Sequence, residues 1–172
     1  MKESSRIVVF LPLLAACTGV DPDATRRFEG QAFGDEGADF RPVSAVVERR
    51  CGTLDCHGAP ARPLRIYGQY GLRKPVEEPD ADYYPGGLAP TSEGELTDNY
   101  RSLGGLEPEI TARVATKKEE PESLTLVRKP RLLEKHKGGL LWNKGDDGDI
   151  CVINWLTGVD DTAPCETELL HR

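Results

Sequence analysis

The sequence predicts a mainly α-helical fold, a small domain with long loops and few or no strands. Apolar residues recur at intervals of three and four over several short stretches, which is typical of amphipathic helices. Stretches that alternate apolar and polar residues are almost absent. The 18 glycines and 13 prolines among 172 residues indicate many turns and loops between the helices.

The N-terminal end does not belong to this domain. MKESSR is followed by the ten-residue apolar run IVVFLPLLAA, which is shorter than the about 20 residues needed to cross a bilayer. Its length and flanks are those of a secretory signal. The run ends in small residues before Cys17, an order that resembles a bacterial lipobox. We expect a lipoprotein signal peptide at residues 1–16 and lipid modification of Cys17; the alternative is an ordinary cleaved signal peptide.

Residues 17–39 follow as a lipid anchor and flexible tether. They have no hydrophobic periodicity and many Gly and Asp, a composition that favours a flexible chain. The remaining residues, 40–172, are expected to form one domain. The protein is therefore predicted to be anchored by lipid in the cell envelope, with the outer membrane favoured. Its domain would lie in the periplasm or at the cell surface.

The charge of the chain argues against binding to nucleic acid. Loss of the signal peptide removes Lys2, Glu3 and Arg6 and changes the formal net charge from −7 to −8. An acidic exported domain is poorly suited to a polyanion. We expect redox proteins of the envelope, and the membrane reached through the lipid on Cys17, as its partners.

The first expected helix leads straight into Cys51. Pro42 suits a first helical turn, and Val43, Val46 and Val47 recur with helical spacing. Residues 61–72 alternate weakly and form an extended segment at most.

Two helices are expected next. Ser92 and Glu95 have capping-box spacing, and Gly104 marks an end. Ile110 and Val114 indicate another helix over residues 107–117.

Two more helices complete the expected domain. Ser123 can cap a short helix at residues 124–129 that Pro130 ends. The last helix begins within residues 146–149, and Gly158 stops it.

The five cysteines divide into one single residue and two pairs. With Cys17 taken by lipid, an even number remains, which indicates bridges in an oxidising compartment. Cys151 and Cys165 would close a loop of about 15 residues, worth roughly 3 kcal/mol in the chain-entropy model. We interpret this pair as a structural disulfide.

The other pair, Cys51 and Cys56, is followed directly by His57. Covalent attachment of haem c needs two thiols for its two vinyl groups and a histidine that reaches the iron from the same side. The usual C-x-x-C-H signature has two residues between the cysteines, whereas four intervene here. The longer spacing resembles the C-x4-C-H sites of some multihaem cytochromes c.

Residues 42–160 resemble the divergent c-type cytochrome domains of bacterial exported proteins. The resemblance is carried by the helix before the Cys–Cys–His element and by the stretches SLTLVRKP (123–130), HKGG (136–139) and INWL (153–156). It implies a cytochrome c-like helical domain with one covalent haem c, bound through Cys51, Cys56 and His57.

Composition restricts the second axial ligand of such a haem. Met1, the one methionine, leaves with the signal peptide, so the common His–Met ligand pair is excluded. His136 and His171 remain, and His136 is preferred because Gly138 and Gly139 let a loop approach closely. The alternative is a solvent-facing loop histidine. Five cations are candidates to pair with the haem propionates: Arg62, Arg65, Arg73, Arg128 and Lys129.

We therefore predict an electron carrier with His57 and His136 as iron ligands, and not an enzyme; no catalytic residue is assigned. The alternatives are a haem-free binding or structural lipoprotein with a local Cys51–Cys56 disulfide, and an open-site haem sensor or peroxidase. A zinc site is less favoured, because structural zinc usually takes two paired knuckles.

Overall fold

A computed structural model describes residues 40–75 and 89–171. The part of the chain that it describes contains six α-helices and one short 3-10 helix, and its one β element is an isolated bridge between Tyr67 and Leu72. The mainly α prediction is confirmed. The predicted signal peptide at 1–16, the tether at 17–39 and Cys17 lie outside the described residues.

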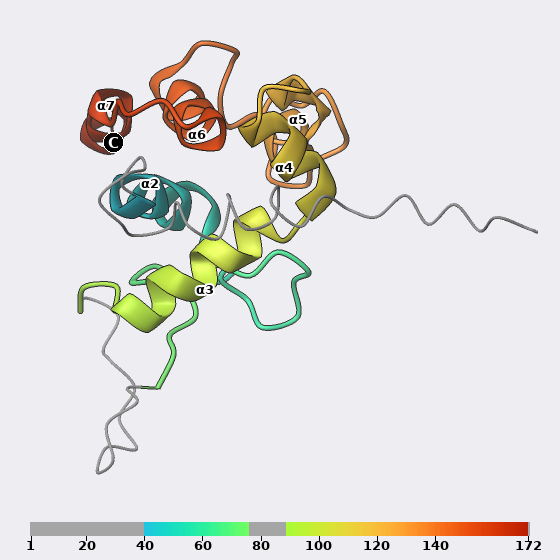
Figure 1. Ribbon diagram of the computed structural model, residues 1–172. Helices are drawn as coiled ribbons and strands as arrows, with labels where there is room; N and C mark the ends of the chain where they lie inside the picture. Colours follow the sequence, from blue (N-terminus) through green and yellow to red (C-terminus); the bar gives the residue numbers. More distant parts are fainter. Residues whose placement is uncertain (1–39, 76–88, 172) are drawn as a thin grey trace, which may run out of the picture.

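The helices follow one another with connections of very different length (Figure 1). In chain order they are α2 (Phe40–Cys51), α3 (Glu93–Gly104), α4 (Pro108–Ala115), the 3-10 helix η1 (Pro121–Ser123), α5 (Thr125–Arg128), α6 (Asp147–Thr157) and α7 (Ala163–Leu170). None of these described helices is long and apolar enough to cross a membrane.

Helix ends agree with the sequence signals at α3 and α6 and differ at α5, and one helix was missed. Ser92 and Glu95 form the capping box of α3, and Gly158 ends α6 in the left-handed conformation at φ 69°. Ser123 does not cap α5, because it belongs to η1 and Leu124 is the residue before α5. Helix α7 was not expected at all.

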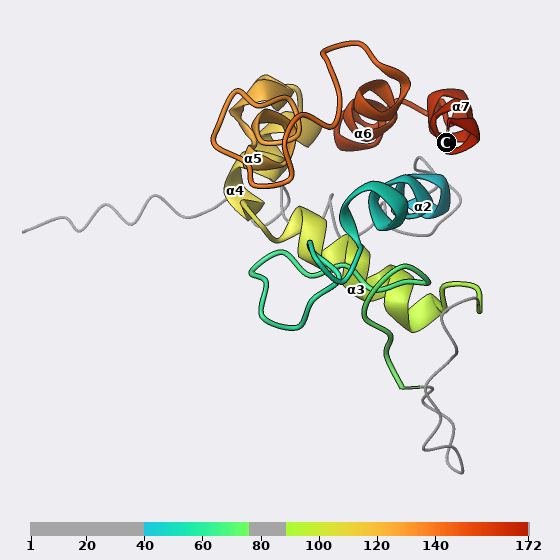
Figure 2. The ribbon, with the colours of Figure 1, turned by 180° about the vertical axis from the view of Figure 1, so that it is seen from behind.

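Helix α2 lies at the centre of the molecule. It packs against α6 and α7 on one side and against α3 on the other (Figures 1 and 2). Phe40, at its start, contacts Tyr100 of α3 and Trp155 of α6, with ring centroids 5.4 and 5.1 Å apart. Such aromatic contacts are among the most stabilising in a core, and they hold the N-terminal end of α2 against α3 and α6.

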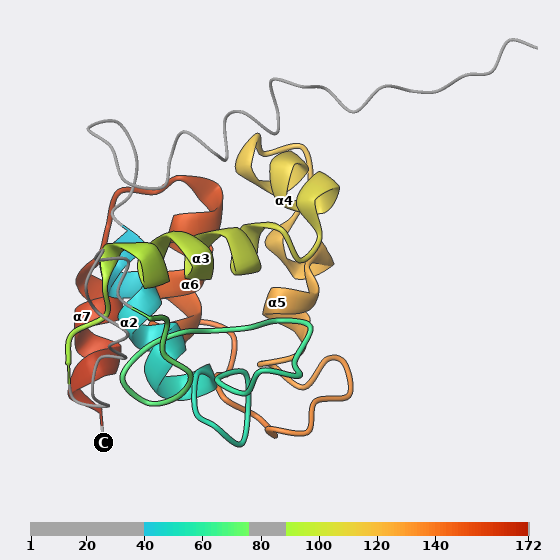
Figure 3. The ribbon, with the colours of Figure 1, turned by 90° about the horizontal axis from the view of Figure 1, so that it is seen from below.

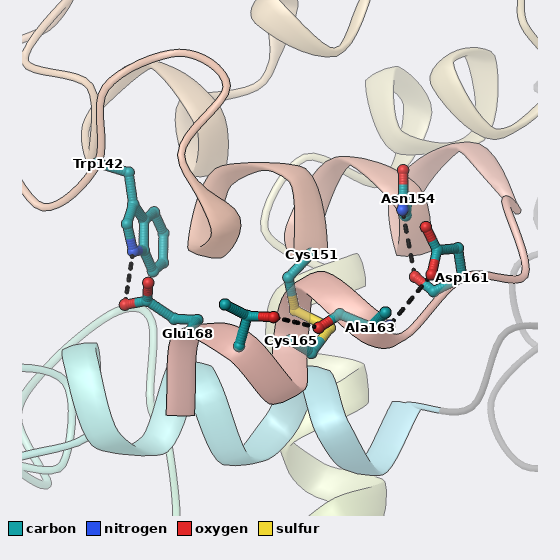
Figure 4. Close-up of a disulfide and its surroundings, with 8 residues drawn as sticks. Trp142, Cys151, Asn154, Asp161, Ala163, Cys165 and Glu168 are labelled. Atoms are coloured by element: carbon teal, nitrogen blue, oxygen red, sulfur yellow. Dashed lines mark hydrogen bonds between the residues drawn. A yellow bond between two sulfur atoms is a disulfide. The ribbon is translucent and has the colours of Figure 1, made fainter. Parts of the chain in front are cut away.

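A disulfide joins α6 to α7. Cys151 and Cys165 are bonded, with their Cα atoms 4.8 Å apart (Figure 4). Helix α7 in turn holds the end of α2, because Glu168 forms an ion pair of 2.5 Å with Arg50. The C-terminal helix thus braces the turn of α2 that precedes Cys51.

Two long connections meet at the C-terminal end of α2. Residues 52–75 follow α2, and residues 129–146 lead into α6; Figure 3 shows both below the helices. The first carries Cys56 and His57, and the second carries His136.

Candidate functional site

The Cys–Cys–His element is a compact turn built on the last residue of α2. Helix α2 ends at Cys51, and the Gly52 N–H still donates to Glu48 O at 2.9 Å. The His57 N–H then donates back to Cys51 O at 2.8 Å. The four residues between the cysteines therefore form a loop whose two ends are hydrogen-bonded together.

Three glycines let the backbone close around this turn. A Cβ atom on Gly58 or on Gly71 would come within 2.0 Å of the carbonyl oxygen of Gly52. The Leu72 N–H donates to Gly58 O at 2.9 Å across the same contact. Since real Cβ atoms do not tolerate such distances, these positions require glycine for the loop to form.

The two ring nitrogens of His57 differ, because Nδ1 makes a hydrogen bond to the backbone and Nε2 has no hydrogen bond of this kind. Its Nδ1 lies 3.0 Å from Leu64 O, and because a carbonyl only accepts, Nδ1 carries the proton. Nε2 then keeps its lone pair, the state in which histidine binds metals. Burial lowers the pKa of His57, with the Leu64 carbonyl opposing the shift. The ring is therefore held neutral.

His136 repeats this arrangement on the other loop. Its Nδ1 lies 3.0 Å from Gly139 O, and because a carbonyl only accepts, Nδ1 again carries a proton. Gly138 packs against the ring, and a Cβ there would meet His136 Cε1 at 2.9 Å. Gly139 has a φ of 78°, in the left-handed region that favours glycine. The HKGG stretch is thus shaped around the imidazole.

The structure brings the two histidines together although they are 79 positions apart. Their ring centroids are 6.4 Å apart and their planes are tilted by 13°. The fold therefore brings two imidazoles from distant segments close together and nearly parallel.

Cys51 and Cys56 are free thiols beside this pair. Burial raises the pKa of Cys51 to about 12, with a smaller contribution from Cys56 in the same direction. Cys51 nevertheless keeps some accessible surface, toward the cavities described next. In the described residues, no group of three or more His, Cys, Asp or Glu side chains is placed to hold a metal ion.

Cys51, His57 and His136 line two adjoining cavities. One has a volume of about 230 Å³, and the second, of about 650 Å³, also includes Cys56. Together they lie in the size range of small-molecule and cofactor sites. The smaller cavity has a largely apolar wall, formed by Val47, Leu64, Leu126, Leu141, Trp142 and Val152.

Cations surround the larger cavity. Its lining contains five of them, against the single acid Asp55: Arg50, Arg62, Lys129, Lys135 and Lys137. Of the five predicted propionate partners, Arg62 and Lys129 are among these residues. The other three do not line it. All five have protein partners: Arg62 donates to the Asp55 and Cys56 carbonyls, and Lys129 lies 3.4 Å from Glu134. Arg73 pairs with Glu95 at 2.8 Å, Arg65 donates to Pro60 O, and Arg128 donates to Glu134.

His171 is not part of this group. Its Nε2 lies 3.5 Å from Asp147 Oδ2, and it lines a different cavity of about 440 Å³. Trp142 lies between that cavity and the smaller one of the site. Its indole N–H donates to Glu168 Oε1 at 3.2 Å (Figure 4), so α7 fixes one wall of the site.

Sequence reasoning missed the ion pair at the base of the His136 loop, which we define as residues 130–141. Arg131 donates two hydrogen bonds to Asp149, at 2.7 and 2.8 Å. Eighteen positions separate the two residues, and neither belongs to a motif. No signal in a single sequence distinguishes this arginine from its exposed neighbours.

Comparisons of this chain with models of known protein families, with curated proteins and with solved structures found no match. The function is therefore inferred from the geometry of the site.

Proposed function

We propose that the protein is an envelope-anchored, single-haem c-type cytochrome that carries one electron at a time between redox proteins. The observation that supports this most is the pair of imidazoles, His57 and His136, whose ring centroids lie 6.4 Å apart beside two free thiols. Cys51 and Cys56 would bind the porphyrin covalently, and the two histidines would ligate the iron. When bound, haem supplies an iron that alternates between Fe(II) and Fe(III).

The protein groups of the site have separate tasks. The carbonyls of Leu64 and Gly139 orient the two imidazoles and increase the basicity of their Nε2 atoms. The apolar wall limits access of water, and Arg62 and Lys129 are placed to pair with carboxylates at the cavity opening. A haem iron with two imidazole ligands is expected to have a lower reduction potential than one with a His–Met ligand pair.

The experiment is the export of the full chain in a bacterium that attaches haem c. We expect the denatured protein to keep the mass of one haem and the native protein to show a sharp reduced-minus-oxidised α band. Cys51→Ser/Cys56→Ser should lose the covalent haem. Cys151→Ala/Cys165→Ala, which removes the same number of cysteines but no free thiol, should keep it. A colourless wild-type protein without the added mass refutes the proposal.

A haem-free lipoprotein stabilised by a local disulfide is the second candidate. It can be recognised by thiol labelling of the protein in urea without reductant. If Cys51 and Cys56 resist labelling in a protein that carries no haem mass, they are bonded to each other, and the second candidate replaces the first.

A further inference from the structure

The loop that carries His136 is closed at its neck but is not fixed by His136 itself. The Leu141 N–H donates to Pro130 O at 2.8 Å and closes the loop of residues 130–141. The hydrogen bond of the His136 ring goes to Gly139 in the same loop. It therefore orients the ring within the loop and does not hold the loop against α2, where His57 lies.

Arg131 connects the neck of this loop to the rest of the molecule. Its Nε and Nη2 donate to the two carboxylate oxygens of Asp149, in the first turn of α6. Its Nη1 donates to Glu122 at 3.0 Å. The side chains of Arg131 and Asp149 are 5% and 7% exposed, so this is a buried bidentate pair. Asp149 also accepts from the Gly145 N–H at 2.9 Å, at the far end of the same connection.

The residue after Arg131, Leu132, has a backbone conformation that leucine disfavours. Leu132 has a φ of 54°, and a leucine in the left-handed region is strained. Such strain persists where surrounding contacts over-determine the conformation. A buried ion pair supplies that constraint, because removing one partner leaves an uncompensated buried charge.

We propose that Arg131, through Asp149, is the positioning residue that keeps His136 beside His57. The pair fixes the neck of the loop to α6, and α6 packs against α2, whose end carries Cys51. Arg131 would therefore set the fraction of protein in which the sixth iron position is occupied. This consequence for the iron rests on the proposed function, whereas the positioning of the loop does not.

Hydrogen exchange tests the positioning without haem. In the full chain expressed without haem attachment, Arg131→Gln should speed exchange of the Leu141 amide by about tenfold or more. Amides in the middle of α2 and α6 should be unchanged. Arg113→Gln, which removes a surface ion pair to Glu119, is the matched control. Unchanged exchange at Leu141 overturns the inference.

The spin state of the iron tests the consequence for the site. Haem-loaded Arg131→Gln should keep its haem but become a mixture of low-spin and high-spin iron, and added imidazole should restore the low-spin spectrum. Arg131→Lys keeps the positive charge, and its high-spin fraction should lie between those of the wild type and Arg131→Gln. If Arg131→Gln does not fold, two other variants remove its contacts separately. Asp149→Asn weakens the pair with Asp149, and Glu122→Gln weakens the contact with Glu122. A fully low-spin spectrum in all of these variants contradicts the inference. A wild type without haem refutes the proposed function and leaves the exchange test decisive.

Discussion

At the residue scale, the site depends on two ring nitrogens that the backbone leaves free. His57 and His136 each place Nδ1 on a carbonyl oxygen at 3.0 Å. In each ring this leaves Nε2 to accept a proton or bind a metal. The carbonyls come from Leu64 and Gly139, so loop conformation, and not a partner side chain, selects the tautomer.

His136→Ala should therefore change the iron and leave the haem in place. The thiols that attach the haem are untouched, but the sixth ligand is lost, so the low-spin spectrum should become high-spin. His171→Ala is the control, because His171 pairs with Asp147 outside the site. Visible and electron paramagnetic resonance spectra provide the measurement. A His136→Ala protein that stays low-spin would show that another group ligates the iron.

Glu48 is a buried acid that faces hydroxyls instead of a cation. Its carboxylate accepts from Ser44 Oγ at 2.7 Å and from Thr91 Oγ1 at 2.5 Å. Burial raises its pKa above 4.5; the two hydroxyls and Arg73 oppose the shift, and nearby Glu95 adds to it. The folded state thus holds this proton more tightly than the unfolded state does.

The sign of the pH dependence follows from this direction. The penalty for ionising Glu48 is absent below the unfolded pKa of 4.5 and grows until the pH passes the higher folded pKa. Measured by urea unfolding, the wild type should lose stability relative to Glu48→Gln as pH rises through this window. Other acids titrate in both proteins and cancel in the difference. A difference that is constant, or that grows with pH in favour of the wild type, contradicts this expectation.

The sequence identifies the residues that define the site more readily than those that position them. Cys51, Cys56 and His57 lie within seven consecutive residues, and His136 is predicted from the expected loss of Met1 with the signal peptide. Arg131 and Glu48 were missed because their roles depend on burial and on partners in distant segments. Nothing in the sequence around a charged residue indicates that its side chain will be buried.

At the element scale, the disulfide between α6 and α7 carries much of the C-terminal structure. Helix α7 has eight residues, too few to be stable alone. Its Glu168 reaches both Arg50 of α2 and Trp142 of the site wall. Loss of the Cys151–Cys165 bond should therefore lower the stability of the packing between α7 and α2.

Reduction of that bond should lower the free energy of unfolding by roughly 3 kcal/mol, because the bridge restricts the unfolded chain. Urea titrations of the haem-loaded protein with and without dithiothreitol measure the change. Cys151→Ala/Cys165→Ala should be insensitive to the reductant. If reduction costs under about 1 kcal/mol, other contacts hold α7 in place.

The helices that could be predicted carry their signals locally. The capping box of α3 and the glycine after α6 each lie within a few residues of the end they specify. Helix α7 has one local signal, Pro164 in its first turn. Its large apolar side chains, Leu169 and Leu170, lie only at its end, so an amphipathic pattern does not mark it, and the disulfide and packing against α2 hold it in place.

At the scale of the whole molecule, the chain joins a compact helical unit to a predicted lipid anchor. The domain has an acidic background, with a formal net charge of −7 for the full chain, yet the larger cavity is surrounded by cations. Charge of opposite sign at one opening orients a charged partner as it approaches.

Cys17→Ser should move the protein from the membrane fraction to the soluble periplasmic fraction, because it removes the predicted lipid attachment while leaving the domain unchanged. Thr25→Ala, a substitution elsewhere in the predicted tether, should stay with the membrane. Fractionation and the mass of the mature N-terminal peptide measure the effect. Membrane association that survives Cys17→Ser would mean that another segment provides it.

The pKa of about 12 at Cys51 has a consequence for the biogenesis of the protein. The compartment that oxidises Cys151 and Cys165 would also oxidise other thiols, and such reactions proceed through the thiolate. In the folded domain, burial favours the protonated form of the Cys51 thiol, which is the form that reacts slowly with oxidants. The same protonation makes it slow to react with a porphyrin. If haem is attached as proposed, we expect attachment to be faster before α2 closes over its last residue, and a refolded haem-free protein to take up haem covalently only slowly.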